Sequence, residues 1–218
     1  MTIVEASDLG KRYGRSWALR ECTLAVGLSV PSAGAVTVPG GRAAGSPAAL
    51  DAIAFVAQDT PVYKTLPVAD MLYLTRALNR RFDQPYARKR LADLGIPLRR
   101  RAGRLSGGQQ AQLALTLALA RRPRLLVLDE PVAMLDPVAR HDFMATVLSA
   151  ATADGVSVLL SSHVLTELER IANYLILLSA GQVRLAGAVD DLLATHGHAS
   201  LEDLALTHLR QTTPEATR

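Results

Sequence analysis

Two uncharged, largely apolar runs constrain the fold of this chain more than any other feature. Residues 125–128 are closed by Asp129 and Glu130, and residues 156–160 follow after a helical stretch. Neither run alternates polar and apolar residues as a strand with one face in water would. Strands that are buried on both faces and separated by helices are typical of a parallel sheet covered by helices. The sequence therefore predicts an α/β fold.

Turn residues and hydrophobic spacing predict the remaining elements. We expect helices behind Pro67 and Pro85, because proline suits the first turn of a helix. The chain of 218 residues suits one domain over residues 1–218. A helical lobe at about 60–110 is then inserted between core strands, and a helical tail follows at about 186–218. Further strands are expected at 3–6, 17–26, 35–38, 53–57 and 174–178, and further helices at 107–120, 137–153, 165–172, 189–195 and 200–209.

Composition excludes several classes of protein. Hydrophobic residues make up 49% and charged residues 20%, which excludes a disordered tail or a coiled-coil rod. Cys22 is the single cysteine, so no intrachain disulfide forms. We expect neither a signal peptide nor a membrane span, since no apolar stretch approaches roughly 20 residues. A soluble, cytosolic protein is the expectation.

The basic residues are mostly arginine. Only Lys11, Lys64 and Lys89 among the 24 basic residues are lysine, and the net charge is +4. Runs at 80–81, 88–90 and 99–101, with Arg104, could bind nucleic acid, acidic lipid or an acidic partner. We favour solvated helix faces for runs this short, and we expect no nucleic-acid partner.

Asp129 and Glu130 stand where an open α/β sheet binds its ligands, beyond the carboxyl end of a strand. An aspartate there can hold Mg²⁺ through water, and the adjacent glutamate can polarise an attacking water. A strand that merely ends in an acidic turn explains this pair equally well.

A more specific pattern is Leu105, Ser106, Gly107, Gly108 and Gln109. The two glycines expose backbone N–H groups at a helix start, the serine adds a hydroxyl, and the helix dipole favours an anion. The plain alternative is a serine-capped helix. The acidic pair that follows along the chain favours an anion site.

With these residues the chain resembles the nucleotide-binding domain of ATP-binding cassette (ABC) proteins over essentially its whole length. Residues 105–109 resemble the signature motif, 125–130 the Walker B motif, and 133–136 the D-loop. The resemblance implies a P-loop NTPase-like parallel core with an N-terminal antiparallel β subdomain. It extends to Gln58 as the Q-loop glutamine, His163 as the switch histidine and Tyr13 as the aromatic residue that stacks on adenine.

The resemblance also implies the ligands and partners. ATP and Mg²⁺ are the expected cofactors, with Glu130 and His163 as catalytic residues and Asp129 and Gln58 at the metal. The partners are a second ABC domain and separate membrane permease subunits, which places the chain at the inner face of the membrane. Residues 200–207 resemble the tail of exporter subunits. The residues expected to contact nucleotide are Tyr13, Gln58, Leu105, Ser106, Gly107, Gly108, Gln109, Asp129 and Asp136.

One motif of that family has no counterpart here. The phosphate-binding loop, Walker A, reads Gly-x-x-x-x-Gly-Lys-Ser/Thr, and none of Lys11, Lys64 and Lys89 stands in that context. In the placement that we favour, a central strand–loop–helix unit is truncated after Val26, and 35–38 follows the gap. In the other placement, 35–38 is the strand before a damaged loop at 40–46.

These residues lead to three hypotheses. The first is an ABC transporter ATP-binding subunit whose site is completed by an intact partner; we expect negligible ATPase activity from the chain alone. The second is a non-hydrolysing regulatory or remnant subunit. The third, a soluble ABC protein acting on DNA or ribosomes, is least favoured, because the chain has neither a tandem cassette nor a coiled-coil insertion.

Overall fold

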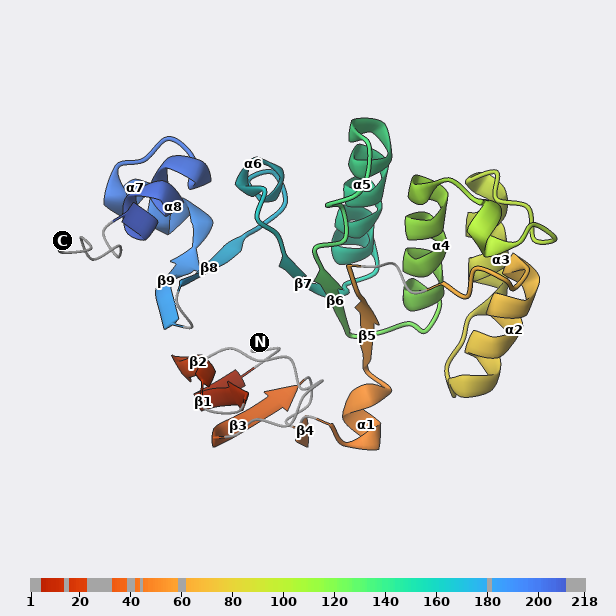
Figure 1. Cartoon of the computed structure of the whole chain (residues 1–218), viewed down its shortest axis with the longest axis horizontal. Coiled ribbons are helices and arrows are strands. Elements are labelled where there is room, and N and C mark those ends of the chain that lie inside the picture. The colour runs from red at the N-terminus through yellow and green to blue at the C-terminus, as the bar shows by residue number, and fades with distance from the viewer. Residues whose placement is uncertain are drawn as a thin grey trace. The chain divides into compact units, whose positions relative to one another are not determined.

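Two compact units make up the described part of this computed structural model (Figure 1). One lies within residues 39–162, and the other combines parts of 4–38 and 163–218. The described residues are 5–13, 16–22, 33–38, 42–43, 45–58, 62–179 and 182–210.

A parallel sheet forms the centre of the first unit. Its strands are β5 (Ile53–Val56), β6 (Leu125–Asp129) and β7 (Ser157–Ser161), with β6 in the middle. The four apolar residues of β6 are buried, as the absence of alternation predicted. Both apolar runs therefore lie in one parallel sheet, and the predicted α/β fold is confirmed. The strand β4 (Arg42–Ala43) and the short helix α1 (Pro47–Leu50) precede β5 in the chain.

Helix α4 (Gly107–Leu119) lies between α5 (Pro137–Ala153) and the pair formed by α2 (Val68–Leu78) and α3 (Gln84–Asp93) (Figure 1). A short 3₁₀ turn, η1 (Ala102–Arg104), leads into it. Helices α2, α3 and α4 share one apolar core, which stabilises their packing because apolar burial is the main favourable term in folding. Its buried members are Val62, Val68, Met71, Leu72, Ala87, Leu91, Ile96, Ala102, Leu105, Leu113, Leu117 and Ala120.

Residues 98–100, which precede α4 in the chain, are hydrogen-bonded to the start of α2. The backbone N–H groups of Val68 and Ala69 donate to the carbonyls of Arg100 and Leu98, at 3.0 and 2.9 Å. Pro67, at the helix start, offers no side-chain cap, so these carbonyls satisfy N–H groups that the helix itself cannot. The lobe thereby fixes where α4 begins.

Antiparallel strands dominate the second unit. Strand β1 (Glu5–Tyr13) pairs antiparallel with both β2 (Ser16–Cys22) and β3 (Ala33–Val38). Strand β8 (Tyr174–Ser179) pairs antiparallel with β9 (Gln182–Ala188). Helices α6 (Leu165–Leu168), α7 (Val189–His196) and α8 (Leu201–Arg210) complete the unit.

Two expectations about this unit hold only in part. The strand expected at 174–178 is present as β8, but it pairs antiparallel with β9, a strand that was not expected from the sequence. The apolar run suggested burial on both faces, yet Tyr174 and Leu178 are 58% and 42% exposed. The helix expected at 165–172 ends after one turn, at Leu168.

None of the helices in the described residues is both long and apolar enough to cross a lipid bilayer.

Candidate functional site

The acidic pair lies at the carboxyl edge of the parallel sheet, beside Ser161. Asp129 ends β6 and is in register with Ser161, the last residue of β7. The Ser161 hydroxyl donates to Asp129 Oδ1 at 2.7 Å, and the Glu130 N–H donates to Ser161 Oγ at 3.0 Å. One serine therefore orients the aspartate and holds the backbone of the glutamate. Sequence spacing indicates no role for Ser161, since only the pairing of β6 with β7 brings it to Asp129.

Glu130 has an unusual backbone conformation, with a φ of 45°. This is the left-handed region, which costs a residue with a β-carbon roughly 1–2 kcal/mol. The bond from the Glu130 N–H to Ser161 helps to hold that conformation. Such strain is found where a side chain has to be aimed, so Glu130 is a credible reactive group.

Gln58 reaches the same edge from the neighbouring strand. It follows β5 by two residues and is exposed. Val56 of β5 is in parallel register with Leu128, so the residues after them leave the sheet at one edge. The edge thus offers carboxylate, hydroxyl and amide oxygens. This donor set fits a hard cation such as Mg²⁺, which prefers oxygen ligands.

The signature residues form the start of α4. Ser106 is the N-cap: its hydroxyl accepts from the Gln109 N–H at 3.2 Å, and its own N–H donates to Gln109 Oε1 at 3.2 Å. The amides of Gly107 and Gly108 donate to no other group among the described residues. Two amides at a helix N-terminus, with Ser106 exposed beside them, suit an anion. Leu105 is only 5% exposed and anchors the loop in the lobe core.

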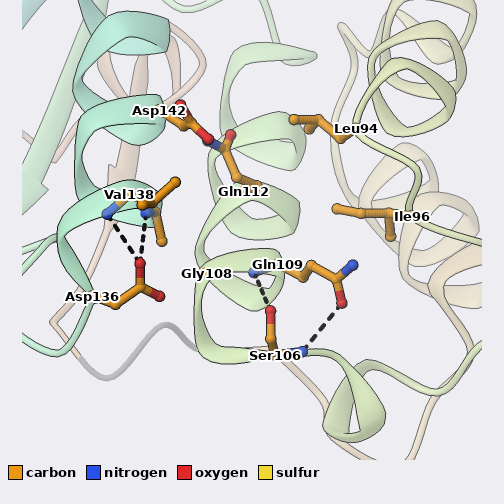
Figure 2. A pocket seen from close by; sticks show the side chains of 10 residues that line it. Leu94, Ile96, Ser106, Gly108, Gln109, Gln112, Asp136, Val138 and Asp142 are labelled. Carbon is orange, nitrogen blue, oxygen red and sulfur yellow. Dashed lines mark hydrogen bonds between the residues drawn. The ribbon is translucent and has the colours of Figure 1, made fainter.

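Asp136 caps α5 beside this loop. Its Oδ1 accepts from the N–H groups of Val138 and Ala139, at 3.0 and 2.9 Å. Asp136, Ser106, Gly108 and Gln109 line one pocket (Figure 2). The helix starts come very close here, since a β-carbon on Gly108 would meet Ala139 Cβ at 2.6 Å. The structure therefore brings the predicted signature and D-loop residues together.

Tyr13 and His163 belong to the second unit. Tyr13 is the last residue of β1, and His163 is exposed two residues after β7. Their place beside the nucleotide stays a prediction.

Arg90 departs from the expectation that the basic runs are solvated. Its guanidinium donates to Thr116 Oγ1 at 3.1 Å, Gln112 Oε1 at 2.8 Å and Thr146 Oγ1 at 2.9 Å. Burial lowers the pKa of Arg90, with Tyr86 and Asp93 opposing that shift. Arg90 joins α3 to α4 and α5, whereas Arg88 and Lys89 in the same run are exposed.

Comparison with known families gives a clear match. The ABC transporter family model matches residues 22–133, which is more than half of the chain. The phosphonates import ATP-binding protein PhnC of Thiobacillus denitrificans is 32% identical over 83% of this chain and 74% of its own length. The molybdenum import ATP-binding protein ModC of Paramagnetospirillum magneticum is 29% identical over 85% of this chain. This chain spans only 54% of that ModC's length.

Solved structures agree on the fold. An ATP-binding subunit of an ABC transporter aligns with a TM-score of 0.82 at 24% identity, covering 95% of this chain and 100% of that one. A dimeric ATP-binding cassette, MJ0796 bound to ADP and Pi, aligns with a TM-score of 0.72 at 20% identity, covering 86% of this chain and 99% of that one. ABC proteins bind ATP, and the oxygen-lined edge and the anion-binding helix start are consistent with that ligand. By its sequence, its sheet and its helical lobe, the chain belongs to the ABC transporter family of ATP-binding proteins.

Proposed function

We propose that this chain acts as one half of a composite ATP site, giving its signature loop to a partner domain that carries an intact phosphate-binding loop. The observation that carries the proposal is the contrast between two phosphate-binding elements. The α4 start has Ser106 as its N-cap, and within the part of the chain that the structure describes the amides of Gly107 and Gly108 donate to no other group. The sequence nowhere contains Gly-x-x-x-x-Gly-Lys-Ser/Thr.

The positions of the lysines support this proposal. Lys11 lies within β1, and Lys89 pairs with Asp93 on the exposed side of α3, at 2.7 Å. Lys64 is exposed in a turn before α2 rather than at a helix start. A Walker A lysine has to stand at the first turn of a helix, where it reaches the phosphates.

Strand pairing favours the first placement of the gap. Residues 33–38 form β3, which pairs antiparallel with β1. A strand that leads into a phosphate-binding loop belongs to the parallel sheet, so β3 is a poor candidate for that role. The residues just before β3 (27–32) lie outside the described residues, and of the damaged loop considered at 40–46 the structure describes only 42–43 and 45–46.

The roles proposed for the site residues follow from their geometry. Asp129, oriented by Ser161, and Gln58 would hold Mg²⁺ at the sheet edge; the ion supplies charge neutralisation for the phosphates when it is bound. Glu130 would accept a proton from the attacking water. Ser106 and the amides of Gly107 and Gly108 would donate to the terminal phosphate. Tyr13 and His163 would contact adenine and phosphate, as the resemblance implies.

We also propose that the chain docks on separate membrane permease subunits at the inner face of the membrane. PhnC and ModC are named as import proteins, which favours import over the exporter branch that residues 200–207 suggested. The exporter assignment has no support from these relatives.

Mixing experiments test the composite site. We expect negligible ATP hydrolysis by the purified chain, and ATP-dependent dimer formation with an intact homologue whose own signature serine is changed to alanine. Hydrolysis by that mixture should disappear with Ser106→Ala in this chain. Ser200→Ala is the matched control, because Ser200 caps α8 by accepting from the Asp203 N–H at 3.1 Å.

Two results would contradict the proposal. Rapid hydrolysis by the chain alone, abolished by Glu130→Gln, would reveal a phosphate cradle within this molecule. Absence of any dimer with ATP would favour the regulatory or remnant subunit instead.

A further inference from the structure

A pocket of about 250 Å³ crosses α4, between α5 and the segment that follows α3 (Figure 2). Part of its wall consists of the signature loop and Asp136, which are expected at the ATP site, but the rest of its lining has no role expected there. Leu94 and Ile96 form an apolar wall, and Gln112 and Asp142 contribute polar groups. Figure 2 shows the Gln112 side chain leaving α4 on the side of Asp142, and Leu94 and Ile96 pointing toward α4.

Gln112 presents an unsatisfied donor at this pocket. The side chain is only 6% exposed, and its Nε2 is buried without a hydrogen-bond partner among the described residues. Its Oε1 accepts from Arg90 Nη2 at 2.8 Å. An arginine can only donate, so the amide oxygen has to face Arg90 and the NH₂ group has to face away from it. The amide orientation therefore follows from the chemistry of Arg90.

A buried NH₂ group without an acceptor is unusual, because nearly all buried polar groups in native proteins are hydrogen-bonded. Thr116 Oγ1 and Thr146 Oγ1 each accept from the guanidinium, and among the described residues neither of them accepts from Gln112 Nε2. The acceptor for Gln112 has to come from whatever fills the pocket.

The polar groups on the Gln112 side of the pocket differ from those at the signature loop. Asp142 is exposed on α5 on the Gln112 side (Figure 2), whereas Ser106, Gly108 and Asp136 lie at the loop where we propose that a phosphate binds. The Asp142 carboxylate attracts a cation to the Gln112 side of the pocket. The apolar wall then suits a short hydrocarbon body.

We propose that this pocket binds a small organic cation that also carries a hydrogen-bond acceptor, such as an amine joined to a carbonyl by a short chain. The acceptor would meet the NH₂ of Gln112, and the ammonium group would meet Asp142. The pocket volume of about 250 Å³ leaves room for a small molecule of this kind. The groups that this proposal uses, Gln112 and Asp142, have no role in the proposed ATP function, and their ligand can be tested without nucleotide.

The test compares three probes on the full chain. They are 4-aminobutanamide, which has both groups and about seven non-hydrogen atoms, butylamine, which lacks the acceptor, and butanamide, which lacks the cation. Binding is followed by NMR through the Gly108 amide in every variant, and also through the Gln112 side-chain NH₂ wherever Gln112 is retained. We expect 4-aminobutanamide to bind at least about fivefold more tightly than either control probe, as one added hydrogen bond allows.

Two substitutions each remove one of the two interactions with the probe, the hydrogen bond to its acceptor or the attraction of its positive charge. Gln112→Glu keeps an acceptor for Arg90 but replaces the donor, so the advantage of 4-aminobutanamide over butylamine should fall to about one. Asp142→Asn removes the charge, so its advantage over butanamide should fall to about one. Asp70→Asn, an exposed acid on α2 that does not line the pocket, is the matched control and should leave both ratios unchanged.

The Asp70→Asn control measures the general effect of removing one negative charge, because a ratio against neutral butanamide does not cancel that effect. The proposal is overturned if the three probes bind alike, if none shifts the two reporter signals, or if both ratios survive the two substitutions. In any of those cases the pocket holds only water, or Asp142 itself turns to accept from Gln112.

Discussion

Replacing either of the two adjacent glycines at the start of α4 with alanine should change the free energy of unfolding differently: the change at Gly108 should be destabilising, and the change at Gly107 should not. An alanine β-carbon at Gly108 would lie 2.6 Å from Ala139 Cβ, whereas an alanine at Gly107 would meet nothing within 4 Å. Ordinary carbon contacts begin near 3.4 Å, so α4 and α5 would have to separate by about 0.8 Å. Both atoms are β-carbons fixed to helical backbone, so no rotamer change relieves the clash.

The free energy of the clash can be bounded. Overpacking in a well-packed core costs about 1–3 kcal/mol, and replacing glycine with alanine in a helix returns at most about 1 kcal/mol. We therefore expect Gly108→Ala to lose about 1–2 kcal/mol of unfolding free energy and Gly107→Ala to be neutral or slightly stabilising. For a chain of this size, a gap of about 2 kcal/mol separates the two melting temperatures by about 4–8 °C.

Circular dichroism at the helix band during thermal unfolding is the appropriate assay. The single tryptophan, Trp17, lies in β2 of the other unit, so its fluorescence does not report on α4. Ala139→Gly should rescue Gly108→Ala, because the next atom near the new β-carbon is Ala139 Cα at 3.8 Å, an ordinary contact. The double-mutant cycle should give a coupling free energy of at least about 1 kcal/mol. Equal melting temperatures for the two single variants, or no rescue, would refute the close approach of the helices.

Three further substitutions probe other parts of the fold. The pKa of Asp83 is lowered, first by the backbone N–H of Tyr86 and then by a neighbouring arginine, so its stabilisation is complete above about pH 4 and is lost at lower pH. Asp83→Asn should therefore lower the melting temperature at pH 7 but not at pH 2; an equal loss at both values would contradict this. Ser161→Ala should cost about 0.5–1.5 kcal/mol in urea unfolding through the lost bond to Asp129, and unchanged stability would show that this bond is not formed. Phe143→Ala should cost about 3–5 kcal/mol, because that ring is fully buried in α5; a loss below about 1 kcal/mol would place it at the surface.

Much of the site geometry could be predicted from local sequence. The parallel sheet follows from two apolar runs without alternation, and the cap of α4 follows from Ser106 with Gln109 three residues later. These features depend only on residues near one another in the chain, so spacing is enough to identify them.

Features that depend on tertiary contacts could not be predicted. Ser161 meets Asp129 only because β6 and β7 pair in that register. The antiparallel partner of β8 was missed because an apolar run does not show whether its faces are covered. Arg90 could have been identified, since it lies three residues after the buried Ala87 and so shares its helix face. The run of basic residues obscured that pattern.

The left-handed backbone of Glu130 has a practical consequence for engineering. Glycine adopts that conformation without a steric penalty, so a library selected only for heat resistance should accumulate Glu130→Gly. Variants with this substitution would unfold at a higher temperature and would lack the carboxylate that we propose as the proton acceptor. Any selection for thermostable variants of this protein therefore has to measure ATP binding or hydrolysis as well as the melting temperature. A selection on melting temperature alone would favour variants that have lost the Glu130 carboxylate.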